Sequence, residues 1–217
     1  MDKMVSVVIP AFNESANLRT LVSLLDHTFT CMGDVQYECI IVNDGSTDDT
    51  RVVLEHLRHS YPWLRPLHMR HNSGQSAALL AGMRLARGDY LITLDGDQQN
   101  DPRDIPKIVD ALEHYDCVCG YRAQRNDVWH RRLTSWCGNL ARRWIVDDGI
   151  RDAGCGTKGF RRNCLEHMVP FNGVHRFFAA MVRNGGLSVT EIPVAHHPRT
   201  HGRSKYGLGN RIFWVLY

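Results

Sequence analysis

The sequence predicts an α/β fold in which helices flank a mainly parallel central sheet. Short apolar runs rich in β-branched residues recur through the first part of the chain, and segments with helical spacing separate them. The expected strands are 4–10, 37–42, 64–68, 90–94 and one that begins at Cys117. Strands that alternate with helices in this way pair in parallel, and the helices cover both faces of the sheet.

Two helices are expected in the first quarter of the chain, each with a residue placed to cap its start. Ser15 is positioned to cap a helix whose apolar positions follow helical spacing: Leu18, Leu21, Val22 and Leu25. Thr47 or Asp48 is expected to cap a second helix that runs to about Leu57. Both helices would connect consecutive strands, as parallel pairing requires.

Two more helices are expected before residue 120. Gly74 opens an alanine- and leucine-rich helix that ends before Gly88, and Pro102 lies near the start of the next helix. Farther along, residues 129–146 place aromatic and leucine side chains on one helical stripe: Trp129, Leu133, Trp136, Leu140 and Trp144. Because Arg132 and Arg143 flank this stripe, a buried core helix and a helix lying on a membrane surface both fit it.

Composition places the chain among ordinary globular proteins. It has 217 residues, of which 43% are hydrophobic and 23% are charged. The seven cysteines are scattered without a CxxC pair, which indicates free thiols and a reducing cytoplasmic setting. We expect no signal peptide and no bilayer-spanning segment, although the apolar run 212–217 resembles the start of a membrane segment.

Charge is distributed unevenly along the chain. Residues 1–118 carry 10 Lys/Arg and 17 Asp/Glu, whereas residues 119–217 carry 16 and 6. An acidic half suits a metal site, and a basic half suits a phosphate-bearing partner or an anionic surface. The acidic first half and the absence of RNA-binding sequence motifs argue against nucleic acid as the partner.

Polar residues follow several of the expected strands directly. Asn13 and Glu14, Asp44, and the pair Asp95 and Asp97 all lie just past a predicted strand end. Ligands of open α/β sheets bind at the carboxyl ends of the strands. These side chains are therefore expected to converge on one edge of the sheet.

The Asp95-Gly96-Asp97 segment is the sharpest chemical signal. Two carboxylates on a tight turn after a buried strand can hold a hard divalent cation, and Gln99 is close enough to support it. Such a cation bridges the phosphates of a nucleotide and stabilises charge on the leaving group. The alternative is ordinary turn chemistry. Asp44 likewise suits a nucleobase or ribose contact, or a turn and helix cap.

Three other sequence patterns suggest binding sites but also have simpler structural interpretations. The GxGxxG match at 154–159 does not follow the first strand, so it is interpreted as a loop or strand. His196, His197 and His201 lack a complementary ligand set and are interpreted as solvated loop residues. The loop with Arg203 and Lys205 carries several glycines and could close cations over bound phosphates, or it could be a solvated basic loop.

Taken together, the motifs resemble family 2 glycosyltransferases of the GT-A fold, specifically the branch that acts on polyprenyl phosphates. The matching segments are 10–14 (Pro-Ala-Phe-Asn-Glu), 43–46 (Asn-Asp-Gly-Ser), 72–75 (Asn-Ser-Gly-Gln), 95–99 (Asp-Gly-Asp-Gln-Gln), 120–122 (Gly-Tyr-Arg), 129–139 and 202–206 (Gly-Arg-Ser-Lys-Tyr). Asn43 departs from the family pattern, which has an acid there. The leucine at position 140 argues against the motif of processive synthases.

This resemblance implies a role for each matched residue. The expected nucleotide-sugar contacts are Pro10, Ala11, Asn13, Glu14, Asp44, Gln75, Asp95 and Arg203. The expected ligands of a Mg²⁺ or Mn²⁺ ion are Asp95, Asp97 and Gln99. The expected catalytic residues are Asp97, Arg122, Arg131, Ser135 and Lys205, with Arg131 and Ser135 facing the lipid phosphate.

The resemblance also implies one GT-A domain over 1–211 with a Rossmann-like nucleotide-binding half. Residues 1–120 would hold the nucleotide sugar and metal, 121–211 the acceptor, and 212–217 would begin a membrane segment. The expected reaction is inverting transfer from a UDP- or GDP-linked sugar to undecaprenyl or dolichyl phosphate, at the cytoplasmic face of a membrane.

Two alternatives stay open at this point. One is a family 2 enzyme that acts on a saccharide hydroxyl, for which Asp152 is a candidate base. The other is a non-catalytic module that binds nucleotide sugars or anionic lipids.

Overall fold

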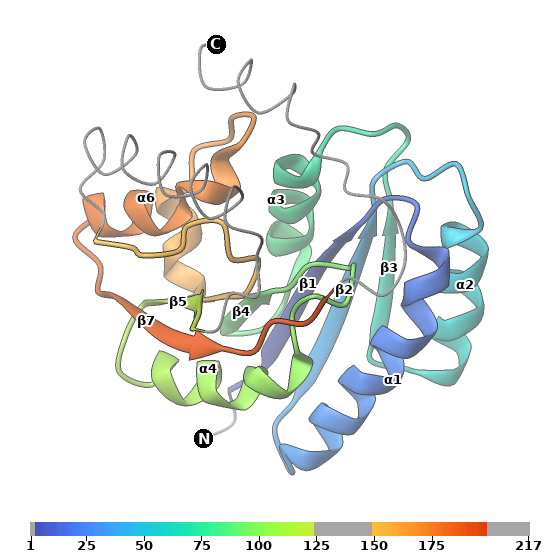
Figure 1. Ribbon diagram of the computed structural model, residues 1–217, viewed down its shortest axis with the longest axis horizontal. Helices are drawn as coiled ribbons and strands as arrows, with labels where there is room; N and C mark the ends of the chain where they lie inside the picture. Colours follow the sequence, from blue (N-terminus) through green and yellow to red (C-terminus); the bar gives the residue numbers. More distant parts are fainter. Residues whose placement is uncertain (1–2, 124–148, 199–217) are drawn as a thin grey trace.

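The computed structural model describes residues 3–123 and 149–198, which form a sheet with helices on both faces (Figure 1). The first half alternates strictly in the order β1 (Val5–Ala11), α1 (Ser15–Cys31), β2 (Tyr37–Asn43), α2 (Thr50–Ser60), β3 (Leu64–His68), α3 (Gln75–Leu85) and β4 (Tyr90–Thr93). The second half adds η1 (Pro102–Asp104), α4 (Ile105–Leu112), β5 (Cys117–Arg122), β6 (Lys158–Arg161), η2 (Arg162–His167), η3 (Val174–Arg176), α6 (Phe178–Asn184) and β7 (Val189–Val194).

The seven described strands lie in the order β3-β2-β1-β4-β6-β5-β7. The block β3-β2-β1-β4 is parallel throughout, and β5 pairs with β7 in parallel. The strand β6 lies between β4 and β5 and is antiparallel to both. The predicted mainly parallel sheet is therefore confirmed, and the predicted strand positions agree with the structure to within one residue.

Two hydrophobic layers hold the helices against the sheet. On one face, Leu21 of α1, Leu54 of α2 and Ile108 of α4 belong to one buried cluster. On the other face, Met83 of α3 and Phe178 of α6 belong to a second cluster. Figure 1 shows α3 beginning at the same end of the sheet at which β1, β2 and β3 finish. This arrangement brings the start of α3 next to the predicted site.

The starts of the first two helices differ from the prediction. Ser15 is the first residue of α1 rather than its cap, and Glu14 occupies the capping position. The helix α2 begins at Thr50, three residues after Thr47, although the Asp48 carboxylate does accept a hydrogen bond from the Thr50 N–H (3.0 Å). The physical reason is that residues 46–48 are already engaged in a turn against the loop after β1.

Five elements of the second half were not predicted from the sequence: β6, η2, η3, α6 and β7. In addition, the predicted tryptophan-rich helix at 129–146 and the segments 202–206 and 212–217 lie outside the described residues. Within 3–123 and 149–198, none of the helices combines the length and the apolar character needed to cross a membrane.

The packing of α3 on the sheet gives a testable prediction. A Cβ on Gly82 would overlap the Val8 side chain and lie 2.9 Å from Cγ2 of Val42. Although alanine is the better helix former, we expect Gly82→Ala to lower the unfolding free energy by about 1 kcal/mol or more, because overpacking outweighs propensity. Urea denaturation measures this change. The exposed Arg84→Ala on the same helix is the control, and a Gly82→Ala protein more stable than its parent would contradict the tight contact.

Candidate active site

Parallel pairing brings the residues that follow β2 and β4 to the same edge of the sheet, on either side of β1. Asp44 follows β2, and its backbone N–H donates to the carbonyl of Ala11 at the end of β1 (2.9 Å). On the other side of β1, the N–H of Leu94 donates to the carbonyl of Val8 (3.2 Å), which places Asp95 just beyond. The predicted convergence of these acids is therefore confirmed at the level of the backbone.

The loop after β1 is fastened to the loop after β2. Asn13 adopts a left-handed conformation (φ 55°), and its side-chain oxygen accepts from the N–H of Thr47 (2.8 Å) while its own N–H donates to Ser46 Oγ (2.9 Å). The Glu14 carboxylate accepts from Asn17 Nδ2 (2.6 Å). The contacts of Asn13 fasten the two loops to each other, and the nucleotide-binding roles of Asn13 and Glu14 stay predictions.

Pro10 and Ala11 contribute mainly their backbone at this edge. The Ala11 side chain is buried in the core. A Cβ on Gly96 would lie 3.0 Å from the carbonyl oxygen of Pro10, so the Asp95–Asp97 turn lies closely against the end of β1. The nucleotide-binding roles predicted for Pro10 and Ala11 also remain untested.

Asp44 binds the start of α3. Its two carboxylate oxygens accept from the N–H groups of Ser73 (2.7 Å) and Gly74 (2.8 Å). A carboxylate at this place is stabilised by the free amides and the positive end of the helix dipole. Asp44 thus binds the start of a helix, which agrees with the alternative of a turn and helix cap. The helix is α3, however, whose preceding residue Gly74 lies 30 residues after Asp44. Its predicted nucleotide contact stays a prediction.

The two acids of the Asp95–Asp97 turn are held by different partners. Gln75 Nε2, from the first turn of α3, donates to Asp95 Oδ1 (2.8 Å), and the backbone N–H of Asp95 donates to the Asn100 side chain (3.2 Å). Asp97 is buried, and its Oδ1 accepts from the N–H of Gln99 (3.1 Å). Gln75, predicted to contact the nucleotide sugar, is therefore also a partner of a predicted metal ligand.

Gly156 packs against the Asp95 carboxylate, a contact that sequence reasoning missed. A Cβ on Gly156 would overlap all three carboxyl atoms of Asp95, with Oδ1 2.7 Å away. Thr93 Oγ1 donates to the carbonyl of Gly156 (2.8 Å), which fixes the segment beside β4. The GxGxxG match was correctly interpreted as loop and strand, but one of its glycines leaves room for an acid of the candidate site.

A buried lysine, Lys158, holds the loop that carries Gly156 through hydrogen bonds to the loop backbone. Lys158, the first residue of β6, donates its ammonium protons to the backbone carbonyls of Ala153 (3.3 Å) and Cys155. A buried charge is tolerated only when such polar partners satisfy it. Lys158 gives no motif signal, and the pairing of β6 with β4 that puts it here is a long-range feature.

Arg122 and Asp152 form a bidentate pair at the end of β5. Arg122 Nε lies 2.7 Å from Asp152 Oδ2, and its Nη2 lies 2.8 Å from Oδ1. Asp152 is buried, so the guanidinium neutralises a charge that would otherwise be costly. Arg122 is predicted to contact phosphate and Asp152 to act as a base in one alternative. The structure shows the two side chains bound to each other, and both roles stay predictions.

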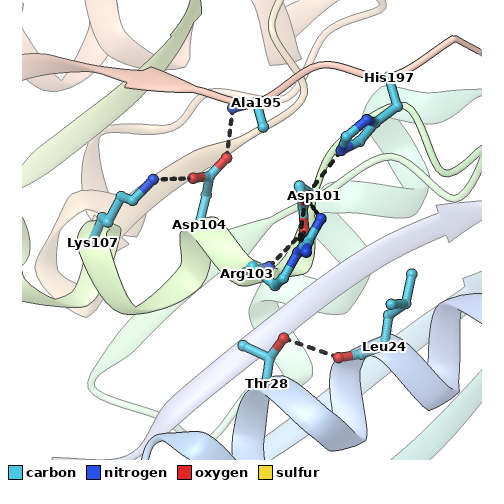
Figure 2. Close-up of polar contacts among 8 residues, drawn as sticks. All are labelled: Leu24, Thr28, Asp101, Arg103, Asp104, Lys107, Ala195 and His197. Atoms are coloured by element: carbon cyan, nitrogen blue, oxygen red, sulfur yellow. Dashed lines mark hydrogen bonds and ion pairs between the residues drawn. The ribbon is translucent and has the colours of Figure 1, made fainter.

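Asp101 connects the segment after Asp97 to the residues that follow β7 (Figure 2). Its carboxylate accepts from Arg103 Nη2 (2.7 Å) and lies 2.9 Å from His197 Nε2. The Arg103 hydrogen bonds, together with His197, hold the pKa of Asp101 well below its ordinary value despite partial burial. His197 is an exposed loop residue, as predicted, and it also contacts a carboxylate from another segment.

The residues present fit a divalent cation bound through oxygen. Asp95 and Asp97 supply two carboxylates, and Gly156 leaves space beside the first. Among the described residues, no cluster of three or more His, Cys, Asp or Glu could enclose a metal ion alone. Magnesium-type sites commonly use one or two carboxylates and complete their coordination with water and substrate phosphates. The predicted ligand role of Gln99 stays a prediction.

Four predicted site residues cannot be placed: Arg131, Ser135, Arg203 and Lys205 lie outside the described residues. The described residues therefore cover the half of the chain that is predicted to hold the nucleotide and metal, together with Arg122 and Asp152.

Comparison with known proteins agrees with this geometry. Residues 6–169 match the family model described as glycosyl transferase family 2. The dodecaprenyl-phosphate galacturonate synthase of Rhizobium johnstonii is 37% identical over 217 residues, which cover 97% of this chain and 64% of that protein. The undecaprenyl-phosphate 4-deoxy-4-formamido-L-arabinose transferase of Pseudomonas aeruginosa is 36% identical over 205 residues, which cover 94% and 60%. The chain spans just under two thirds of the length of these relatives.

Solved structures support the same fold. The glucosyl-3-phosphoglycerate synthase of Mycobacterium tuberculosis, in complex with phosphoglyceric acid, matches with a TM-score of 0.69 at 21% identity, covering 91% of this chain and 73% of that one. A mannosyltransferase of Pyrobaculum calidifontis, in complex with GDP-Man and Mn²⁺, matches with a TM-score of 0.65 at 19% identity, covering 89% and 55%. The predicted GT-A fold is confirmed.

The contact between Gly156 and Asp95 predicts the effect of a single methyl group. In Gly156→Ala the added Cβ must displace the Asp95 carboxylate, so we expect Mn²⁺ affinity to fall roughly 10-fold or more, as when the support of a metal ligand is lost. Isothermal titration calorimetry with Mn²⁺ measures the affinity. Gly154→Ala is the matched control, because its nearest neighbours are 3.7 Å away. Equal Mn²⁺ affinities in Gly156→Ala and Gly154→Ala would contradict the assignment of Asp95 as a metal ligand.

The partly buried His175 predicts a pH dependence of stability. Burial, followed by the charges of Lys158 and Arg176, lowers the pKa of His175 from 6.5 to about 3. Below pH 6.5 the unfolded chain takes up a proton that the folded protein rejects, so stability falls with pH down to about 3. Between pH 7 and 5 this group is expected to remove about 2 kcal/mol of unfolding free energy.

Urea denaturation of the parent and of His175→Asn at both pH values tests this expectation. The variant should lose correspondingly less stability between pH 7 and 5. If both proteins show the same change, His175 is not the titrating group.

Proposed function

The chain belongs to glycosyl transferase family 2, and we propose that it transfers a sugar from a nucleoside diphosphate to a polyprenyl phosphate. The observation that carries the proposal is the pair Asp95 and Asp97 at the carboxyl edge of the sheet, with Gln75 bound to the first acid. The printed names of the relatives from Rhizobium johnstonii and Pseudomonas aeruginosa supply the acceptor class. The acidic first half and the basic second half of the chain agree with a metal site and a phosphate-bearing acceptor.

A divalent cation, Mg²⁺ or Mn²⁺, is the proposed partner of Asp95 and Asp97. It would neutralise negative charge on the departing diphosphate. Solved structures of the mycobacterial synthase contain Mn²⁺ with UDP-glucose, and the Pyrobaculum mannosyltransferase contains Mn²⁺ with GDP-Man. We therefore propose a UDP- or GDP-linked donor for this chain.

In the proposed reaction a phosphate oxygen of the acceptor attacks the anomeric carbon of the sugar. The bond from that carbon to the donor diphosphate breaks, and the nucleoside diphosphate leaves from the opposite face, so the anomeric configuration inverts. The acceptor phosphate is already ionised near neutral pH and needs positioning by cations more than a general base. Arg122, at the end of β5, is the proposed cation for this positioning.

The Arg122–Asp152 pair favours a phosphate acceptor over a saccharide hydroxyl. A hydroxyl acceptor requires a carboxylate to take its proton. Both oxygens of Asp152 accept from Arg122, so a hydroxyl would have to displace the guanidinium to reach this acid. A phosphate acceptor, in contrast, is already ionised and needs no such base. We place the reaction at the cytoplasmic face of a membrane, where undecaprenyl or dolichyl phosphate would be presented.

The metal assignment predicts the consequence of removing one charge. Asp97→Asn should lower sugar transfer by roughly 100-fold or more, because a ligand that stabilises leaving-group charge is lost. Transfer is measured with the complete protein, sugar nucleotides, Mn²⁺ or Mg²⁺, and undecaprenyl or dolichyl phosphate. Asp110→Asn, an exposed carboxylate of α4, is the control. Full activity of Asp97→Asn would refute the metal role.

The acceptor class is tested in the same assay. Polyprenyl phosphate should be used in strong preference to polyprenol or to free saccharides. Faster transfer to a saccharide hydroxyl would replace the proposed acceptor, and binding of sugar nucleotides without turnover on any acceptor would favour a non-catalytic module.

A further inference from the structure

The first turn of α3 connects three separate parts of the molecule. Just before the helix, the N–H groups of Ser73 and Gly74 bind Asp44 after β2. The next residue, Gln75, binds Asp95 after β4. The residue after that, Ser76, is buried and faces the segment 173–176, where its hydroxyl oxygen lies 2.7 Å from His175 Nδ1.

Two groups near the start of η3 hold the Ser76 hydroxyl. The N–H of Gly173 donates to Ser76 Oγ (3.0 Å), and the same oxygen lies 2.7 Å from His175 Nδ1. Because a hydroxyl oxygen can accept two hydrogen bonds and donate one, the Ser76–His175 hydrogen bond can form with either group as the donor. Desolvation and the nearby charges of Lys158 and Arg176 lower the pKa of His175.

We propose that Ser76 and His175 are positioning residues of the metal site, which hold the first turn of α3 so that Gln75 orients the Asp95 carboxylate. Consecutive helical residues point about 100° apart, so one rotation of the helix decides where both side chains lie. A rotation that breaks the Ser76–His175 bond therefore also moves the Gln75 amide away from Asp95. The inference rests on the proposed function in that Asp95 is taken to bind a cation.

The segment 173–176 is itself suited to act as a fixed support. Gly173 adopts a left-handed conformation (φ 86°), which turns the chain into η3, and Val174 is fully buried. Figure 1 shows α3 close to the α6 side of the molecule, where η3 precedes α6. The hydrogen bond thus joins the nucleotide half of the domain to an element that lies about 100 residues farther along the chain.

The test measures Mn²⁺ binding directly, by electron paramagnetic resonance of the free ion. The complete protein is used with UDP or GDP, whichever stabilises the parent more. We expect Ser76→Ala and His175→Leu to weaken Mn²⁺ binding about 10-fold, the effect typical of losing a residue that orients a metal ligand. His175→Asn, whose side-chain oxygen can accept the Ser76 proton, should retain most of the affinity.

Double substitution separates positioning from a general loss of stability. If Ser76 acts through Gln75, Ser76→Ala should add little in a Gln75→Ala background, because contacting residues of one network are not additive. Additive losses in Mn²⁺ affinity, or an unchanged affinity in Ser76→Ala, would overturn the proposal. Should His175→Leu not fold, Ser76→Ala decides alone, since alanine is smaller and favours helix.

Ser6→Ala is the matched control. Ser6 is also buried, and its hydroxyl also makes two hydrogen bonds, to Glu38 (2.7 Å) and from the N–H of Gly88 (2.8 Å), but near the start of β1. This variant should lose thermal stability without losing Mn²⁺ affinity, and an equal loss of affinity would overturn the proposal. A parent protein that binds Mn²⁺ but transfers no sugar would refute the proposed function and leave this test valid.

Discussion

The parallel pairing of β1 with both β2 and β4 is the constraint on which the rest of the site depends. It brings the residues after β2 and after β4 to one edge, on either side of the end of β1. The acids there repel one another unless each has a partner. The structure provides backbone amides at the start of α3 for Asp44 and the Gln75 amide for Asp95. The start of α3 therefore supplies hydrogen-bond donors to two acids.

The first half of the fold and the place of the site could be predicted from the sequence, because both depend on local pattern. Apolar runs that are followed by Asn13, Asp44 and Asp95 define the strands and their carboxyl ends. Helix starts were less predictable. The turn at 46–48 binds Asn13, more than 30 residues earlier in the chain, and this delays α2 to Thr50. A capping signal is read locally, whereas this contact is not local.

The remaining contacts of the site depend on elements that carry no periodic signal. The strand β6 has four residues and one of them is a buried lysine, so neither its length nor its composition indicates a central strand. Gly156 is informative only once its distance to Asp95 is known. The Arg122–Asp152 and Ser76–His175 contacts join residues far apart in the chain. The sequence singles out Arg122 and Gln75 as candidate site residues, but it does not indicate their protein partners.

The position of β6 in the sheet also affects when the parts of the domain can form during synthesis. Because β6 separates β4 from β5, one edge of β4 has no neighbouring strand until Lys158–Arg161 has been synthesised. Until then the turn with Asp95 lacks Gly156 beside it, and β5 lacks both of its partners. A nascent chain that ends before this point leaves one edge of a central strand unpaired, and this edge is open to wrong pairing with other chains. Protection of β4 is thus a late event, and the acidic turn is completed with it.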